Sequence, residues 1–383
     1  MGTALAELTL PRKISKGARR LFLATGVIAS NFPDLDSLYT GVSPPPLGYL
    51  LHHRGHTHTV VGLIAQALLI ALVCFAPPLR RAIRAAGSPR FWALVAVSLA
   101  GHLVLDSWNT YGVHPFWPLD SRWYYGDAIF IFEPWLWLFL GVAAAFNARR
   151  RGFGIAISVA VFALLAALAA AGVLPLVALL ALILCGAGLA WRARAVPSAA
   201  RAAGALVASA VLVAGMFGLA GIARSRTRAL LGPEREILEV VVNPNPGWPV
   251  CWDVIAIARD GAELVLRRGT LSLLPGLYAP ARCASHRLES HGPAPEGAPL
   301  AWSGELRQPV GALRDLDRRD CRVRAWLQFG RAPFVRDGTI ADLRFESGMR
   351  GNFTAMAVTG EDRGCPPALT SWARPRADVL SNP

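Results

Sequence analysis

Long apolar runs separated by short polar loops dominate the first 223 residues. A helix that crosses a bilayer needs about 20 predominantly apolar residues. Runs near this length, the second somewhat shorter, lie at residues 57–76, 91–107, 130–148, 152–171, 174–191 and 202–223. A weaker helix is expected near 14–30, because basic residues confine its uninterrupted apolar part to 21–30. The pattern predicts a polytopic α-helical membrane protein with about seven transmembrane helices.

After residue 223 the long apolar runs stop and charged residues of both signs begin. Short strand-like runs follow, separated by turn-forming segments such as NPNPG and LPG. The runs are EILEVVV, VCWDVIAIA, AELVLRRG, RVRAWLQF, TIADLRFES and NFTAMAVTG. We therefore expect a transmembrane helical domain over 1–223 and a C-terminal β-rich soluble domain over 224–383, which is long enough to bury its own core.

The net charge of +14 accompanies a chain that is 54% hydrophobic. Its basic residues form short clusters between apolar runs and no arginine-rich face interleaved with aromatic side chains, so we expect no nucleic-acid partner. With seven spans, one set of loops holds fifteen Lys and Arg residues, whereas the alternate loops hold only Arg54 and Arg122. The positive-inside rule then places the N-terminus in the cytoplasm and the C-terminal domain outside the membrane.

The cysteines fall into two groups. Cys74 and Cys185 lie inside apolar runs, where a free thiol behaves as a small hydrophobic side chain. The other four lie in the C-terminal domain, at Cys251, Cys283, Cys321 and Cys365. Four cysteines on the outer side suggest two disulfides in an oxidising, periplasm-like space, with three pairings open. A zinc site is the alternative, but no CxxC pair supports it.

Acidic residues and histidines of the membrane half gather on one side. Apart from Glu7, they all fall in the loops assigned to the outer face or at the adjacent helix ends. They are Asp34, Asp36, Asp106, Asp120, Asp127 and Glu133, together with His52, His53, His56, His58, His102 and His114. Ionisable groups near membrane depth are costly, and those present are usually paired, cavity-lining or functional. Their convergence predicts a site.

The spacing within three motifs favours metal binding. In GHLVLD, His102 and Asp106 are four residues apart and project from one face of a helix. In NFPDLD, Pro33 disfavours helix, and an extended loop can turn Asp34 and Asp36 inward. In HHRGHTHT, a glycine lets the chain bend before the next helix. Imidazole and carboxylate ligands together suit zinc, manganese or iron better than calcium.

Structural explanations exist for several of these residues taken singly. His102 and Asp106 could be a buried polar pair that joins two helices. Thr57 is a plausible N-cap for the helix that follows HHRGHTHT. Glu133 could cap the next helix, with Pro134 in its first turn. These explanations leave open why the acids and histidines share one side of the membrane.

The segments NFPDLDSL, HRGHTHTVVG and GHLVLDSWNTYGVHPFWPLDSRWYYGDAIFIFEPW resemble, in order and spacing, the YdjM-like family of bacterial inner-membrane metal-dependent hydrolases. The resemblance covers residues 20–145 most closely. It implies six metal ligands: Asp34, Asp36, His53, His58, His102 and Asp106. Many relatives have a histidine in the first helix, but this chain has none before His52. Where relatives often have Asp before a proline, this chain has Glu133.

The resemblance implies a metal-dependent hydrolase of the bacterial inner membrane whose site opens at the outer, periplasmic face. The expected cofactor is a divalent metal, zinc favoured over manganese or iron, and two nearby ions would activate a water and stabilise a phosphoryl transition state. Arg54 or Arg122 could neutralise a phosphate, and Asp120, Asp127 and Glu133 are further candidates for catalytic roles. The expected substrate is a small phosphoester or the head group of a membrane lipid.

Two alternatives belong to other functional classes. A metal-stabilised, non-enzymatic sensor or assembly factor would use the same ligands to fix its helices, while its periplasmic domain binds an unknown protein partner. A metal- or proton-coupled transporter fits less well, because transport sites usually lie near the midplane of the bilayer.

Overall fold

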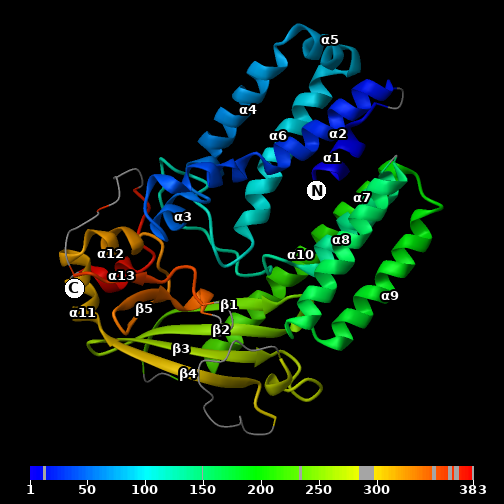
Figure 1. The fold of residues 1–383 in the computed structure, drawn as a ribbon. Helices are drawn as coiled ribbons and strands as arrows, with labels where there is room; N and C mark the ends of the chain where they lie inside the picture. Colours follow the sequence, from blue (N-terminus) through cyan, green and yellow to red (C-terminus); the bar gives the residue numbers. More distant parts are fainter. Residues whose placement is uncertain are drawn as a thin grey trace.

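In the computed structural model the described residues are 1–11, 14–148, 150–232, 235–283, 297–346, 351–360, 365 and 371–381. The first half is helical. Its helices are α1 (Gly2–Thr9), α2 (Lys16–Asn31), α3 (Leu47–His52), α4 (Val60–Cys74), α5 (Pro77–Ala86), α6 (Ser88–Ser107), α7 (Pro134–Asn147), α8 (Arg151–Ala170), α9 (Leu176–Ala193) and α10 (Ser198–Ala229). Figure 1 shows α1, α2 and α4–α6 gathered in one group and α7–α10 in another, with the sheet at one end.

Four of the described helices are long and apolar enough to cross a membrane: α6, α8, α9 and α10. The bent pair Leu47–His58 and Val60–Cys74, with an angle of 69°, brings the number to five if it is one broken span. The predicted number of seven is therefore not reached. At 1.5 Å per residue, the 14 residues of α7 extend about 21 Å, less than the roughly 30 Å of a bilayer core.

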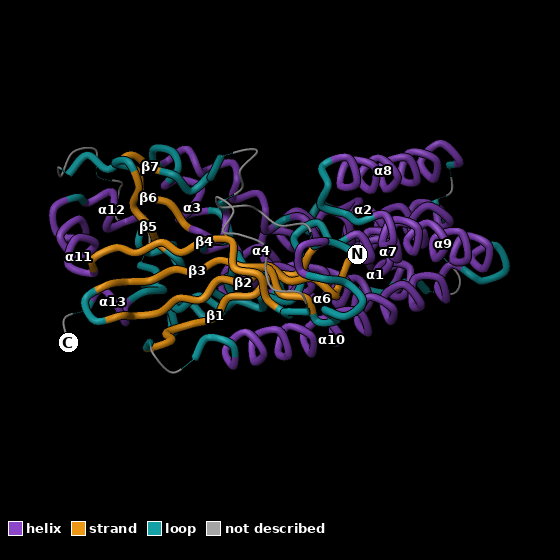
Figure 2. The backbone as a smooth tube through the Cα atoms, turned by 90° about the horizontal axis from the view of Figure 1, so that it is seen from below, coloured by secondary structure: helices purple, strands orange, loops and turns teal. Residues whose placement is uncertain are grey.

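The C-terminal half contains an antiparallel sheet with the strand order β1–β2–β3–β4. The prediction that this half is rich in β-strands is therefore confirmed. A smaller antiparallel sheet has the order β5–β6–β7. The strands are β1 (Glu236–Asn245), β2 (Trp248–Asp260), β3 (Glu263–Ser272), β4 (Leu300–Pro309), β5 (Pro333–Arg336), β6 (Thr339–Asp342) and β7 (Met356–Ala357), and the helices are α11 (Val310–Arg319), α12 (Cys321–Trp326) and α13 (Ala377–Leu380). Figure 2 shows the strands on one side of the molecule and most of the long helices on the other.

One predicted strand is wrong. The run RVRAWLQF begins with helix α12, because the carboxylate of Asp320 accepts hydrogen bonds from the backbone N–H groups of Arg322 and Val323 and so caps a helix there. The strand β4 was not predicted, since its exposed and half-buried positions give a weak alternation. The run TIADLRFES is a strand only over Thr339–Asp342.

The four cysteines of this half form two disulfides, Cys251–Cys283 and Cys321–Cys365. Their formation was predicted, whereas their pairing was not. Cys74 and Cys185 are free thiols.

The two halves share their hydrophobic cores. The expected boundary at residue 223 falls inside α10, whose last turns pack against the large sheet around Val240 and Trp252. A second cluster joins Leu50 and Tyr111 of the first half to Trp326 of α12. The C-terminal half is thus packed directly against α3 and the loops that follow α3 and α6, as Figures 1 and 2 both show for α3.

Candidate metal centre

Three short segments at one end of the helices carry the predicted ligands. The 3₁₀ helix Pro33–Val42 follows α2, with Pro33 in its first turn, and contains Asp34 and Asp36. The extended loop predicted for NFPDLD is therefore wrong, since proline fits the first turn of a new helix, where no N–H donor is needed. The 3₁₀ turn His56–His58 precedes α4, and His102 lies in the last turns of α6.

The first group of ligands consists of Asp34, His58, His102 and Asp106, whose candidate donor atoms all lie within 4.8 Å of one another. His58 Nε2 is 3.1 Å from His102 Nε2 and 3.1 Å from Asp106 Oδ2. Asp34 Oδ1 is 3.5 Å from His58 Nε2 and 3.4 Å from His102 Nε2. Two nitrogens and two carboxylate oxygens therefore face one point.

The hydrogen bonds behind the two imidazoles fix the direction of their free lone pairs. His102 Nδ1 lies 2.7 Å from the carbonyl oxygen of Ser30, which can only accept, so this nitrogen carries the proton. His58 Nδ1 lies 3.2 Å from the Asp36 carboxylate, so it donates as well. The Nε2 atoms of both imidazoles therefore face the group, and once a metal ion displaces their protons, their lone pairs point into it.

This arrangement fits a metal ion. Metal-bound histidines commonly donate their second N–H group to a carboxylate or a backbone carbonyl, as His58 and His102 do here. In addition, Asp106 Oδ2 is buried and accepts no hydrogen bond from the described residues. A cation at this point would satisfy that oxygen and both lone pairs.

The second group of ligands consists of Asp34, Asp36 and His53, and it shares Asp34 with the first. Asp36 is fully buried. Its carboxylate lies 3.0 Å from His53 Nδ1 and accepts hydrogen bonds from the Arg54 N–H group at 2.8 Å and the Thr57 hydroxyl at 2.9 Å. These contacts orient the segment 53–58. Asp34, by contrast, has 47% of its side chain exposed, which opens the centre to the outside.

The carboxyl groups of Asp34 and Asp36 remain ionised. Burial alone would raise the pKa of Asp36, but the hydrogen bonds from His53 and His58 outweigh it and hold that pKa well below its usual range. The same balance lowers the pKa of Asp34, where His102 and His58 are the partners. Both carboxylates are therefore available as anionic ligands near neutral pH.

Arg54 positions Asp106. Its guanidinium contacts Asp106 Oδ1 at 2.9 Å through Nη2 and donates through Nη1 to Asn109 Oδ1 at 2.9 Å and to the Asp106 carbonyl at 3.1 Å. It also lies over the ring of Tyr111, at 5.0 Å from the centroid. The side chain is buried, so its contact with a substrate phosphate stays a prediction.

Asp120 and Arg122 lie outside both ligand groups. They form an ion pair in which Arg122 Nη2 is 2.7 Å from Asp120 Oδ2, and the arginine side chain is 74% exposed. The Tyr124 hydroxyl donates to the same carboxylate at 2.8 Å. The hydrogen bonds from Arg122 and Tyr124 hold the pKa of Asp120 below its usual range.

Asp127 and Glu133 also lie outside the two groups. Asp127 is buried and forms an ion pair with Arg331 of the C-terminal half, with both N–O distances 2.8 Å. Glu133 caps α7: its side chain accepts from the Trp135 N–H group, and Pro134 occupies the first turn. The capping role weighed from the sequence is confirmed. The catalytic roles of Asp127 and Glu133 stay predictions.

The other histidines of HHRGHTHT face different partners. His52 Nε2 lies 3.2 Å from the Ser43 hydroxyl, and His56 packs against the rings of Trp117 and Trp372. Thr57 is not an N-cap. Thr59 caps α4, accepting from the Gly62 N–H group, because His56–His58 forms a turn of its own before the helix begins.

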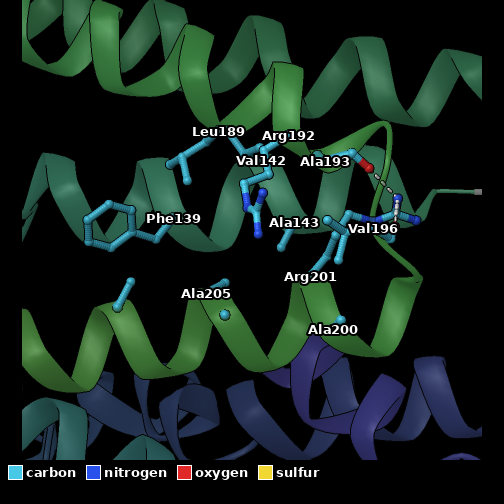
Figure 3. A pocket seen from close by; sticks show the side chains of 12 residues that line it. Phe139, Val142, Ala143, Leu189, Arg192, Ala193, Val196, Ala200, Arg201 and Ala205 are labelled. Atoms are coloured by element: carbon cyan, nitrogen blue, oxygen red, sulfur yellow. Dashed lines mark hydrogen bonds between the residues drawn. The ribbon is translucent and has the colours of Figure 1, made fainter.

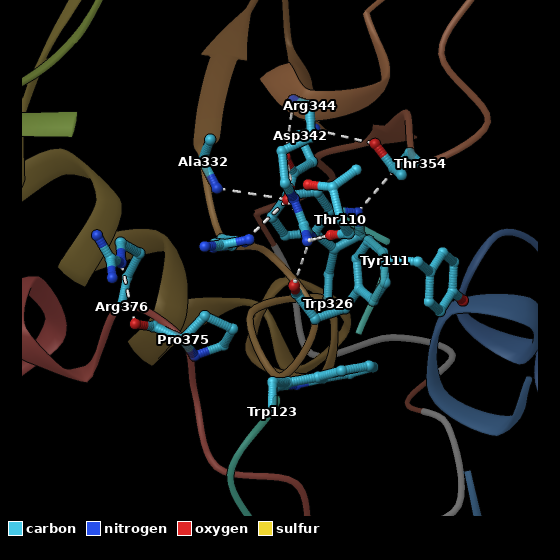
Figure 4. Close-up of polar contacts among 12 residues, drawn as sticks. Thr110, Tyr111, Trp123, Trp326, Ala332, Asp342, Arg344, Thr354, Pro375 and Arg376 are labelled. Carbon is cyan, nitrogen blue, oxygen red and sulfur yellow. Dashed lines mark hydrogen bonds and ion pairs between the residues drawn. The ribbon is translucent and has the colours of Figure 1, made fainter. Parts of the chain in front are cut away.

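Two residues support the centre in a way that the sequence did not predict. Asn109 holds Arg54, and the Thr57 hydroxyl holds Asp36. The signal for Asn109 was its place in the NTYG motif directly after the His102–Asp106 pair. The C-terminal half also contacts the NTYG motif. The guanidinium of Arg344, which pairs with Asp342, donates to the Thr110 carbonyl at 2.7 Å, as Figure 4 shows.

Comparison with known proteins finds relatives for the first half of the chain, which contains the candidate site. Residues 1–175 match the model of the YdjM inner membrane protein family. The chain is also 36% identical to the inner membrane protein YbcI of Escherichia coli (strain K12) over 137 residues, which make up 35% of this chain and 66% of that protein. No solved structure matches the chain. Residues 1–175, which contain all six predicted ligands, are thus similar to this family, and the match together with the apolar helices supports a location in the inner membrane.

Proposed function

We propose that the protein is a metal-dependent hydrolase that acts at the periplasmic face of the inner membrane on a phosphoester or a lipid head group. The observation that carries the proposal is the pair of ligand groups joined by Asp34. Zinc is the favoured ion, because it accepts both imidazole nitrogens and carboxylate oxygens and is usually bound by four ligands. A bound divalent ion would supply an activated water and stabilise negative charge on a reacting phosphoryl group.

The side chains of the centre have distinct parts in this proposal. Asp34, the most exposed ligand, lies where a substrate would enter. Asp36 and the Ser30 carbonyl orient the imidazoles of His58 and His102. Arg54 balances the charge of Asp106 and keeps its carboxylate turned toward the centre. The proposed topology has the N-terminus in the cytoplasm and the C-terminal half in the periplasm, the side on which disulfides form.

The test is the metal content of the full-length protein, purified without a histidine tag. We expect bound metal in the wild type and its loss in the double variant His102→Ala with Asp106→Ala. His56→Gln is the matched control, because His56 lies in the same turn as His58 but in neither ligand group. Metal content that is unchanged in the double variant would refute the centre.

Activity is tested separately, with phosphodiesters, phosphomonoesters and phospholipids as substrates. Hydrolysis that depends on added metal and disappears in Asp34→Asn supports the proposal. Metal binding without hydrolysis of any of these substrates would contradict it.

One observation favours the non-enzymatic alternative, a metal sensor or assembly factor. The C-terminal half directly contacts the segments next to the ligands, which are called the ligand loops below. Arg344 donates to the Thr110 carbonyl, and Trp372 Nε1 donates to the Leu51 carbonyl at 2.8 Å. Metal binding could therefore change the surface that the C-terminal half presents to a protein partner. Its signature would be a metal-dependent rise in Tm without turnover.

A further inference from the structure

A groove of about 380 Å³ lies between α7, α9 and α10, as Figure 3 shows. This volume is within the range of roughly 300–1,000 Å³ that is typical of small-ligand sites. Small residues of α10 leave the space open: Gly204, Ala205 and Ala208 form its wall. A Cβ atom added at Gly204 would meet no protein atom within 4 Å. Since α9 and α10 are candidate membrane spans, the groove lies where hydrocarbon chains are the surrounding solvent.

Two arginines line the polar part of the groove, and they differ in their partners. Arg201 is held in place, because its Nε donates to Asn147 Oδ1 at 2.7 Å and its Nη1 to the carbonyls of Ala193 and Val196 at 2.6 and 2.7 Å. Arg192 is exposed, and its side chain forms no hydrogen bond or ion pair with the residues that the structure describes. Figure 3 shows the Arg192 guanidinium directed into the space between the helices.

The charge of the groove is unbalanced. None of the described residues that line it is acidic, so two guanidinium groups stand beside an otherwise apolar wall without an anion. A guanidinium forms paired hydrogen bonds with a phosphate group. Basic pockets between transmembrane helices are suited to anionic lipid head groups. A ligand that joins a phosphate to a hydrocarbon chain matches both parts of the surface.

We propose that this groove binds an anionic phospholipid, with an acyl chain along α10 and the phosphate against Arg192. Arg201 adds positive charge and fixes the turn between α9 and α10 that forms the end of the groove. The site lies at the C-terminal end of α7, whereas the Glu133 cap at the other end of that helix faces the Gly247 turn between β1 and β2. None of the described residues that line the groove belongs to either ligand group, so the site is separate from the metal centre and does not depend on the proposed hydrolase activity.

The test is lipid binding by the full-length protein in detergent, measured by native mass spectrometry. The probes are phosphatidylglycerol, which is anionic, and phosphatidylcholine, which has the same chains and no net charge. We expect the wild type to retain phosphatidylglycerol preferentially. Arg192→Gln should reduce that preference about fivefold, the effect expected from about 1 kcal/mol per basic residue near a lipid surface.

Two further variants separate the parts of the site. Arg194→Gln is the matched control, because Arg194 is also exposed in the turn after α9 but does not line the groove; it should keep the preference. Gly204→Leu should reduce the binding of both lipids, since it fills the groove without a clash with protein atoms. Equal loss in Arg192→Gln and Arg194→Gln would overturn the proposal. So would displacement of the lipid by millimolar inorganic phosphate alone, because the anion would then bind without a chain.

Discussion

Acidification should loosen the contact between the C-terminal half and the ligand loops through His114. This side chain is fully buried, and neither of its ring nitrogens has a hydrogen-bond partner among the described residues. It stacks on Trp372 at a centroid distance of 3.9 Å and contacts Trp123 at 3.8 Å. Burial lowers its pKa from 6.5 to about 3, because a buried imidazolium would lose its hydration and the backbone groups of Arg122 and Ser121 compensate for only part of that loss.

The sign of the pH effect follows from this lowered pKa. Between pH 6.5 and pH 3 the unfolded chain binds the proton and the folded protein does not, so acid favours unfolding. At pH 5 the unfolded state is stabilised by about 2 kcal/mol through this one residue, relative to pH 7.5. The contribution of His114 to stability is therefore complete above its unfolded pKa and is lost progressively as the pH falls toward 3.

His114→Phe tests this reasoning, because phenylalanine keeps the stacking and cannot be protonated. The assay is the free energy of unfolding in denaturant at pH 7.5 and pH 5, in detergent, followed by tryptophan fluorescence. We expect the wild type to lose about 2 kcal/mol more than the variant between the two pH values. His114→Leu, which removes the stacking, should be less stable at both pH values and show the same reduced dependence. An equal pH dependence in wild type and both variants would refute the reasoning.

Other predictions concern the contacts that join the two halves. Replacing Asp127 by Asn breaks a buried ion pair with Arg331 and should cost about 3–5 kcal/mol of stability. The double variant with Arg331→Met should recover part of that loss. If Asp127→Asn loses stability but keeps its metal content, the role of Asp127 is structural. Trp372→Phe removes the donor to the Leu51 carbonyl and should cost about 1–3 kcal/mol, measured by denaturant unfolding. Asp120→Asn alters an exposed pair and should leave Tm unchanged, since surface ion pairs contribute little.

The sequence predicted the type of each half because its signals are local. Apolar runs of 18 to 22 residues predicted α8, α9 and α10, and alternating runs near residue 240 became β1 and β2. The count of seven spans is not confirmed: α4 and α7 are shorter than the apolar runs that predicted them, and α2 includes the basic residues that interrupt its apolar part. Hydropathy alone does not show where the chain leaves the helix, as at the turn before α4.

Residue types and spacing indicated a metal site in the membrane half, because acids and histidines are rare beside membrane helices and here occur together. The choice of six ligands among them, such as His58 rather than His56, was implied by the family resemblance. The spacing did not predict that the ligands form two groups that share Asp34, or that Arg54 holds the carboxylate of Asp106. Those features depend on contacts between separate segments of the chain, such as that between Arg54 and Asp106, which are 52 positions apart.

By itself, then, the amino-acid sequence determined the classes of secondary structure, the membrane character of the first half and a short set of ligand candidates, since each follows from neighbouring residues. Only the tertiary structure decided that Asp127 meets Arg331 and that Cys251 pairs with Cys283. It also decided that the C-terminal half packs on the ligand loops through Trp372. The physical reason is that buried charges, disulfides and aromatic contacts select partners by three-dimensional proximity, which no local pattern encodes.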